Sequence, residues 1–140
     1  MATILVVDDH ITSQRLLRFI LQQDNHAVIT ARNGLQALEC LECISINLIL
    51  TDLMMPEMDG LAFLEHLRME ERYRELPVIA LTGSSREQDY RRARAAGVTA
   101  LLTKPVESQE ILAAVNGLVP PTRERAVGAT GWSLVPAIPS

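Results

Sequence analysis

Five short apolar segments recur along the chain and alternate with longer segments of mixed polarity. Each apolar segment is nearly continuous, as expected for a strand that is covered on both faces within a parallel sheet. The segments predicted to form strands are residues 3–7, 27–31, 47–51, 78–82 and 99–103. The pattern therefore indicates five strands of a buried parallel sheet.

Four of the intervening segments carry apolar residues at helical spacing, and each stripe predicts the buried face of a helix. The stripes are Leu16, Leu17, Ile20 and Leu21; Leu35, Leu38 and Leu41; Leu61, Leu64 and Leu67, with Phe63 beside them; and Ile111, Leu112, Val115 and Leu118. Asp59–Gly60 is the predicted start of the third helix. Gly97 and Gly117 are predicted to end the helices that precede them.

Residues 86–96 differ, because they offer a core only Tyr90 and small alanines. Ser85 and Gln88 have the spacing of a capping box, so the segment is still predicted to be a helix, although a weakly anchored one. The segment also carries four arginines, Arg86, Arg91, Arg92 and Arg94. They form either a solvated helix face or a surface that binds a partner.

Strand and helix alternate five times, which predicts a doubly wound α/β domain. Right-handed crossover connections bring the carboxyl ends of the strands to one edge of the sheet. Ligands of such folds bind at that edge, where the strand order reverses. We therefore expect one domain over residues 1–119, with a functional site at the carboxyl ends of its strands.

Residues 120–140 have a different composition. Four of the seven prolines lie there, beginning with Pro120–Pro121. This composition favours a Pro/Gly-rich linker or a disordered tail rather than a second domain. Trp132, the single tryptophan, is interpreted as an unanchored linker residue, with a docking peptide as the alternative.

The 140 residues are 48% apolar and 21% charged, with a net charge of −4. This balance argues against a general nucleic-acid or anionic-membrane binder, which needs an excess of basic residues. The first residues do not form a targeting presequence, and no apolar segment approaches the ~18 residues that cross a bilayer. We therefore expect a cytoplasmic protein that binds neither nucleic acid nor membranes.

Polar residues stand at the ends of four of the predicted strands. Asp8 and Asp9 follow the first, Asp52 follows the third, Thr82 ends the fourth and Lys104 follows the fifth. Two carboxylates ~4 Å apart repel by about 4 kcal/mol at an effective dielectric of 20, so such a cluster protonates in part or binds a divalent cation. Oxygen ligands alone favour Mg²⁺ or a similar hard cation such as Mn²⁺.

This set of groups is suited to phosphoryl transfer. The Asp52 carboxylate is a candidate nucleophile that attacks phosphorus and forms an acyl phosphate. The cation and Lys104 would neutralise phosphoryl oxygens, and Thr82 would donate a hydrogen bond to one of them. Lys104 is the single lysine among 13 basic residues, which agrees with a position that requires a compact ammonium.

The chain from residue 2 to residue 119 resembles the receiver domain of bacterial two-component response regulators. The matching segments are 4–9, 31–38, 52–60, 77–82, 96–97 and 104–105. The string Asp-x-x-Met-Pro-x-Met-Asp-Gly at residues 52–60 is highly specific for the family. The resemblance implies a flavodoxin-like (βα)5 fold with a five-stranded parallel sheet in the order 2-1-3-4-5.

The resemblance also implies roles for the site residues. Asp52 would accept phosphate from a sensor histidine kinase or a histidine phosphotransfer protein. Asp9 and Asp52 would bind Mg²⁺ directly, Asp8 mostly through water, and the backbone carbonyl of Met54 would complete the protein ligands. Thr82 would move toward the phosphoryl group and change the surface of the fourth helix, fifth strand and fifth helix.

In the family Lys104 would pair with the phosphoryl group, and the bond between Lys104 and Pro105 would be cis. One position departs from the family pattern, because Leu101 stands where many receivers carry a tyrosine or phenylalanine. We therefore expect the phosphorylation chemistry without the aromatic readout. Met54 and Ser84 lie where family members tune the lifetime of the phosphate, and the bulky, apolar Met54 favours slow self-dephosphorylation.

Three other functions compete with a phosphorylation switch. An aspartyl-nucleophile phosphatase needs a second aspartate two residues after the first, where this chain has Met54. We therefore expect no enzymatic activity other than the chain's own phosphorylation and dephosphorylation. A phosphorylation-independent interaction module remains open, as does the N-terminal piece of a larger response regulator. The downstream partner is unknown, and the resemblance is compatible with a monomer or a weak homodimer.

Two further motifs are interpreted as structural. Cys40 and Cys43 have the C-x-x-C spacing, but they lie near the end of a predicted helix, where a thiolate is not stabilised. We expect them to contribute to local packing. His10 follows the acidic pair directly and is expected at the rim of the site rather than on the metal.

Overall fold

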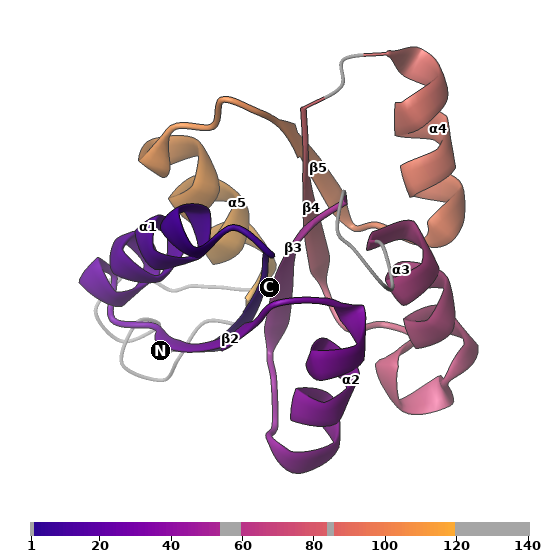
Figure 1. Ribbon diagram of the computed structural model, residues 1–140, viewed down its shortest axis with the longest axis horizontal. Coiled ribbons are helices and arrows are strands. Elements are labelled where there is room, and N and C mark those ends of the chain that lie inside the picture. The colour runs from indigo at the N-terminus through magenta and orange to yellow at the C-terminus, as the bar shows by residue number, and fades with distance from the viewer. Residues whose placement is uncertain (1, 54–59, 84–85, 120–140) are drawn as a thin grey trace, which may run out of the picture.

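The computed structural model describes residues 2–53, 60–83 and 86–119, and these residues form an α/β fold. The five strands form a parallel sheet in the order β2-β1-β3-β4-β5, as predicted (Figure 1). The strands are β1 (Thr3–Val7), β2 (Ala27–Ala31), β3 (Leu48–Asp52), β4 (Val78–Thr82) and β5 (Ala100–Thr103).

Helices cover both faces of this sheet. They are α1 (Ile11–Gln23), α2 (Gly34–Cys43), α3 (Gly60–Met69), α4 (Glu87–Ala96) and α5 (Ser108–Leu118), with a 3₁₀ turn at Glu71–Tyr73. Helices α1 and α5 lie on one face, and α2, α3 and α4 lie on the other (Figure 1). Within the described ranges, no helix is long and apolar enough to cross a membrane.

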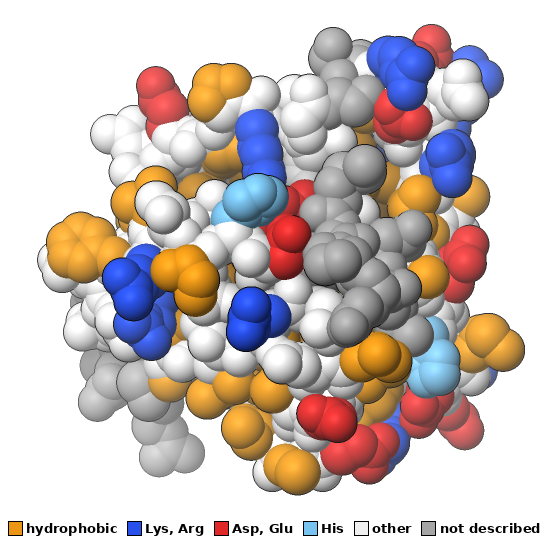
Figure 2. All heavy atoms as spheres, viewed as in Figure 1, with side chains coloured by type: hydrophobic (Ala, Val, Ile, Leu, Met, Phe, Trp, Pro, Cys, Tyr) orange, Lys and Arg blue, Asp and Glu red, His pale blue; other side chains and the backbone are white. Residues whose placement is uncertain are grey.

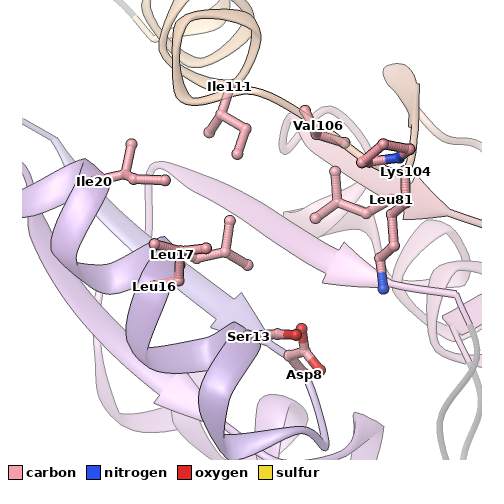
Figure 3. A pocket seen from close by; sticks show the side chains of 10 residues that line it. Asp8, Ser13, Leu16, Leu17, Ile20, Leu81, Lys104, Val106 and Ile111 are labelled. Carbon is pink, nitrogen blue, oxygen red and sulfur yellow. The ribbon is translucent and has the colours of Figure 1, made fainter.

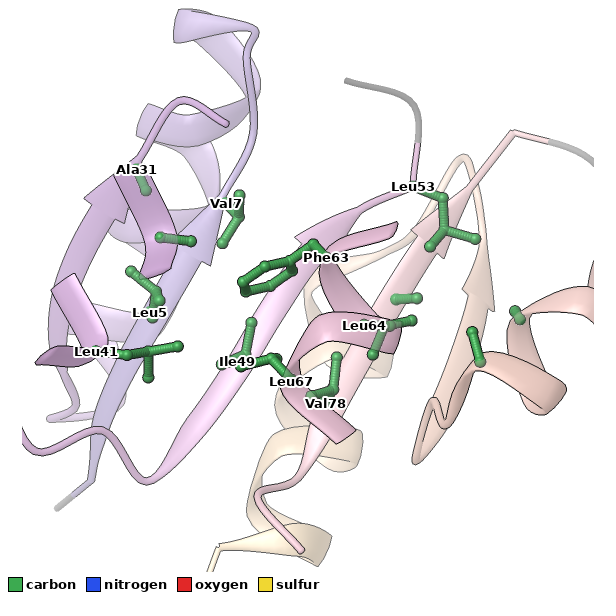
Figure 4. Close-up of a cluster of buried hydrophobic side chains, with 14 residues drawn as sticks. Leu5, Val7, Ala31, Leu41, Ile49, Leu53, Phe63, Leu64, Leu67 and Val78 are labelled. Atoms are coloured by element: carbon green, nitrogen blue, oxygen red, sulfur yellow. The ribbon is translucent and has the colours of Figure 1, made fainter. Parts of the chain in front are cut away.

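The continuous apolar character of the strands follows from this double covering. Along β1, Leu5 and Val7 point into the cluster beneath α2 and α3 (Figure 4). Ile4 and Val6 alternate with them and point into the cluster beneath α1 and α5. Because successive side chains of a strand face opposite ways, each strand contributes to both cores.

Three strand boundaries differ from the prediction by one residue. Residues 47 and 99 were expected to begin strands, but β3 begins at Leu48 and β5 at Ala100. Asn47 and Thr99 precede the ladders and use their side chains as acceptors, for the backbone N–H groups of Thr3 and Val78 respectively. At its other end β3 includes Asp52, which was expected to follow the strand.

Three expectations for the helices are wrong in detail. Leu16 and Leu35 were placed on buried stripes, but their side chains are 58% and 49% exposed. Each lies at the edge of its stripe, whereas Leu17 of α1 and Ala37 of α2 are buried. Gly117 does not end α5, because the helix continues to Leu118, which packs against the core under α1 and α5.

The predicted boundaries of α3 and α4 have mixed outcomes. Gly60 begins α3, and Gly97 ends α4 in the left-handed conformation, at φ +105°, that favours glycine. The capping box is wrong, because Arg86 occupies the N-cap position of α4, one residue later than expected. Ser85, the predicted cap, lies outside the described residues, as does Asp59.

Candidate functional site

The polar residues predicted to form the site lie together at the carboxyl edge of the sheet. Asp8 follows β1, Asp52 ends β3 and Thr82 ends β4, and their exposures are 1%, 4% and 5%. Buried polar groups at these positions contrast with the apolar strands that lead to them. Asp9, also after β1, is partly exposed, and acidic side chains lie beside a histidine near the centre of the face in Figure 2.

Three carboxylates and one imidazole converge at this edge. Asp8, Asp9, His10 and Asp52 each offer one ligand atom, and these atoms all lie within 4.8 Å of one another. The His10 side chain is 71% exposed, and its Nδ1 lies 3.3 Å from Asp9 Oδ1. His10 therefore lies at the rim, as expected, while the carboxylates form the interior of the cluster.

The Asp8 carboxylate is only partly satisfied by the described residues. Its Oδ1 accepts a hydrogen bond from the His10 backbone N–H at 2.9 Å. Its Oδ2 is buried and has no hydrogen-bond partner among the residues that the structure describes. Burial, and to a smaller extent the Asp52 carboxylate, raises the pKa of Asp8, while the hydrogen bond from His10 lowers it in part.

These observations fit a hard cation. A buried carboxylate oxygen without a partner has a free ligand position, and the neighbouring charges need neutralisation. The carboxylate cluster supplies oxygen ligands, which suit Mg²⁺ or Mn²⁺. Asp8, Asp9 and Asp52 could therefore hold such an ion at this edge.

Lys104, which follows β5 directly, completes the cluster. Its Nζ donates to Asp52 Oδ2 at 3.0 Å, so an ammonium contacts the buried carboxylate directly. The Lys104 backbone N–H donates to the Thr82 carbonyl at 2.7 Å, which ties the ends of β4 and β5 together. The peptide bond between Lys104 and Pro105 is cis.

Two residues support the site through contacts that were not predicted from the sequence. Gln14 of α1 is buried, and its Nε2 donates to the carbonyls of Asp8 and Ala31 at 3.1 Å each, so it fixes the end of β1. Gly60 approaches the end of β3 so closely that a Cβ would lie 2.7 Å from the Asp52 carbonyl oxygen. Gln14 could have been noticed in the sequence, because it is a polar residue on the predicted apolar face of its helix.

The remaining predicted positions have varied outcomes. Leu101 is half-buried in β5 and packs against the core under α2, α3 and α4. Met54 and Ser84, expected to contribute a metal ligand and to tune the phosphate lifetime, lie outside the described residues. Cys40 and Cys43 are unpaired thiols, and burial raises the pKa of Cys40, which agrees with packing rather than redox chemistry.

Comparisons with known proteins agree with this fold and identify its family. The family model of the response regulator receiver domain matches residues 4–116. The chain therefore belongs to the response regulator receiver domain family of two-component systems. It is 32% identical over 104 residues to the polar-differentiation response regulator DivK of Brucella anthropi, a match that covers 74% of this chain and 85% of DivK.

Solved structures show the same relationship. The chemotaxis protein CheY4 of Vibrio cholerae is similar with a TM-score of 0.81 and 29% identity, over 85% of this chain and 99% of CheY4. The signal receiver domain of a signal transduction histidine kinase from Syntrophus aciditrophicus has a TM-score of 0.81 and 30% identity, over 96% and 97% of the two chains. Both neighbours share the flavodoxin-like arrangement described above.

Proposed function

We propose that this chain is a phosphorylation-controlled signalling switch in which Asp52 accepts a phosphoryl group from a sensor histidine kinase or a histidine phosphotransfer protein. The observation that carries the proposal is the buried Asp52 carboxylate, which contacts Lys104 Nζ at 3.0 Å inside a cluster of carboxylates. A nucleophilic carboxylate, an ammonium and ligands for a hard cation are the groups that this transfer needs.

In the transfer step, a carboxylate oxygen of Asp52 forms a bond to phosphorus. The bond between phosphorus and the donor's imidazole nitrogen breaks, and that nitrogen keeps the electron pair and takes up a proton. Lys104 is placed to stabilise the negative charge of the phosphoryl oxygens, because its ammonium already contacts Asp52. Thr82, at the end of the adjacent strand, donates a hydrogen bond to one of those oxygens.

Asp9 and Asp52 would bind Mg²⁺ or Mn²⁺ directly, Asp8 mostly through water, and the Met54 backbone carbonyl would complete the protein ligands. The partner-free Asp8 Oδ2 and the raised pKa of Asp8 support a cation at this position. When bound, the cation would neutralise the negative charge on the phosphoryl oxygens during transfer.

The output is a change in the surface formed by α4, β5 and α5, which regulates a downstream protein. Thr82 and Thr103 are paired in register, and the Lys104 backbone donates to the Thr82 carbonyl, so movement of Thr82 reaches β5 directly. With Leu101 in place of an aromatic residue, we expect the coupling to this surface to differ from that of receivers with a tyrosine or phenylalanine.

The switch catalyses its own phosphorylation and dephosphorylation and turns over no other substrate. Met54 and Ser84 set the lifetime of the acyl phosphate, and the apolar Met54 offers water no polar partner, so we expect slow self-dephosphorylation. Loss of the phosphorylated form within seconds would contradict this expectation.

We further propose a cytoplasmic receiver over residues 1–119 with a tail at 120–140, as a monomer or a weak homodimer, without direct binding to nucleic acid or membranes. A second candidate is the N-terminal part of a larger response regulator. The similarity to a receiver domain of a signal transduction histidine kinase supports it only in that this fold also occurs as a domain of another signalling protein.

The decisive test is phosphorylation by acetyl phosphate in the presence of Mg²⁺, measured by intact mass. The native chain is expected to gain the mass of one phosphate, and Asp52→Asn is expected to gain none. Glu65→Gln, which changes an exposed carboxylate on α3, is the matched control and should gain phosphate normally. A native chain that gains no phosphate, or an equal gain in Asp52→Asn, would favour a phosphorylation-independent module.

A further inference from the structure

An open apolar groove lies between α1 and the start of α5, next to the acidic site (Figure 3). Its volume is about 490 Å³. Leu16 and Ile20 form the wall on α1, and Val106 and Ile111 form the opposite wall. Asp8 and Lys104 lie at one end, so the groove meets the site where Asp52 is held.

The surface of α1 is unusually apolar both in this groove and just outside it. The side chain of Leu16 is 58% exposed, and that of Phe19, one turn further along, is 60% exposed. Orange side chains are visible over α1 on the left of Figure 2. Exposed large apolar side chains beside an apolar groove indicate a surface that another apolar segment covers.

The tail of this chain contains such a segment. Residues 126–140 carry no charged side chain, and eight of the fifteen are alanine, valine, leucine, isoleucine or tryptophan. Solvated linkers are usually rich in polar and charged residues, because apolar ones gain by burial. Trp132 is the largest of these side chains and contributes the largest apolar area to an interface.

The chain leaves the domain on the correct face to reach the groove. Val119, the last described residue, is 5% exposed and packs in the same core cluster as Leu17 and Ile111. Helix α5 has 11 residues, so the groove at its start is about 16 Å from its end. Residues 120–131 span up to about 40 Å when extended, which is more than enough to place Trp132 there.

We propose that residues 126–140 dock within the same molecule into the groove between α1 and α5, with the Trp132 ring between Leu16, Ile20 and Val106. The occupant is the chain's own tail rather than a second copy, because a short tether gives an effective concentration in the millimolar range. The tail then covers the α1 side of the acidic edge.

The docked tail is coupled to the site through Lys104. This side chain lines the groove and also holds Asp52, so a change in its contacts at Asp52 changes the wall that the tail contacts. Coupling between two binding events is reciprocal. Phosphorylation is therefore expected to alter docking, a consequence that rests on the function proposed above.

Trp132 is the only tryptophan, so its fluorescence reports docking without a label. The native chain is expected to show blue-shifted emission and at least threefold lower quenching by acrylamide than free tryptophan amide. Leu16→Asp, at a groove position exposed enough to accept the change, should shift the emission to the red and restore quenching. Phe19→Asp is the matched control, because Phe19 is equally exposed on α1 but does not line the groove.

The proposal would be overturned by full quenching of Trp132 in the native chain, by no effect of Leu16→Asp, or by an equal effect of Phe19→Asp. Protection that rises with protein concentration would mean that a second copy supplies the tail, and would also overturn it. Acetyl phosphate with Mg²⁺ should change the emission of the native chain but not of Asp52→Asn. Because protection is measured before any phosphate is added, docking and phosphorylation can fail separately.

Discussion

Helices α3 and α4 have the same length of ten residues and pack beside each other on one face of the sheet, but they are anchored very differently. Helix α3 buries Phe63, Leu64 and Leu67 completely, whereas α4 buries Ala93 and Ala96. Burying a large apolar side chain stabilises by about 1.5–3 kcal/mol, and an alanine methyl contributes much less. The core therefore holds α3 in place and leaves α4 able to move at low cost.

Specific polar contacts add to this difference. At the C-terminal end of α4, Arg68 of α3 donates from Nε to the Gly97 carbonyl at 2.9 Å. The same guanidinium also donates to the carbonyls of Tyr73 and Leu76, so several hydrogen bonds hold the Arg68 side chain in place. Closer to the middle of α4, Tyr90 hydrogen-bonds to Thr103 of β5. Helix α4 is thus attached to α3 at its C-terminal end, and to β5 nearer its middle.

The largest effect should come from breaking the anchor of α3. Leu64→Ala removes a fully buried side chain and leaves a cavity, so we expect a loss of about 2–5 kcal/mol in the free energy of unfolding. Ala93→Gly in α4 should cost about 1 kcal/mol, mainly through helix propensity. Urea denaturation of both variants measures the difference. Equal losses would mean that the two helices are anchored alike.

The attachment between the two helices can be tested at Gly97. Gly97→Ala places a Cβ in the left-handed region and 2.6 Å from Arg68 Cγ, so we expect a loss of about 2 kcal/mol. Gly117→Ala is the matched control, because a Cβ there meets nothing within 4 Å and a helical alanine stabilises by up to about 1 kcal/mol. Thermal denaturation should therefore shift in opposite directions for the two variants.

Much of this comparison was visible in the sequence. The apolar stripe through Phe63, Leu64 and Leu67 predicted a well-anchored α3, and the small residues of 86–96 predicted a weakly anchored α4, as observed. The site followed from the same logic, because parallel strands bring residues that are distant along the chain, such as Asp8 and Asp52, to one edge.

Other features depend on tertiary contacts that spacing does not encode. Arg68 was not singled out from the sequence, because its partners lie 5, 8 and 29 residues away. Gln14 likewise joins carbonyls from two strands. Leu16 was expected to be buried but is exposed. The spacing of a helical stripe does not show which edge of the stripe the sheet covers.

A substitution at the acidic site alters global stability without touching either helix. The pKa of Asp8 is raised, so its stabilising contribution is present at low pH and is lost as the pH rises through that raised value. At pH 7 without metal, Asp8→Asn should therefore stabilise the fold by on the order of 1 kcal/mol, and the gain should disappear below the ordinary pKa of aspartate.

Native-state hydrogen exchange then separates the two helices. We expect amides of α3 to exchange through global unfolding, so Asp8→Asn should slow them about fivefold at pH 7. Amides of α4 are expected to exchange through local opening, so their rates should not change. Equal slowing in both helices would show that α4 does not open by itself. Mg²⁺ should stabilise the native chain more than Asp8→Asn, because the variant lacks one charge of the cluster.

The smallest expected effect concerns the contact between Tyr90 and Thr103. Tyr90→Phe keeps the ring and removes this hydrogen bond, so we expect a loss of about 0.5–1.5 kcal/mol. Exchange of α4 amides should rise severalfold while α3 amides change little, because the bond restrains α4 locally. Thr103→Val removes the other partner, and the double variant should cost less than the sum of the two single losses. Additive losses would mean that the two hydroxyl groups act separately and that α4 is held by its alanines and Gly97.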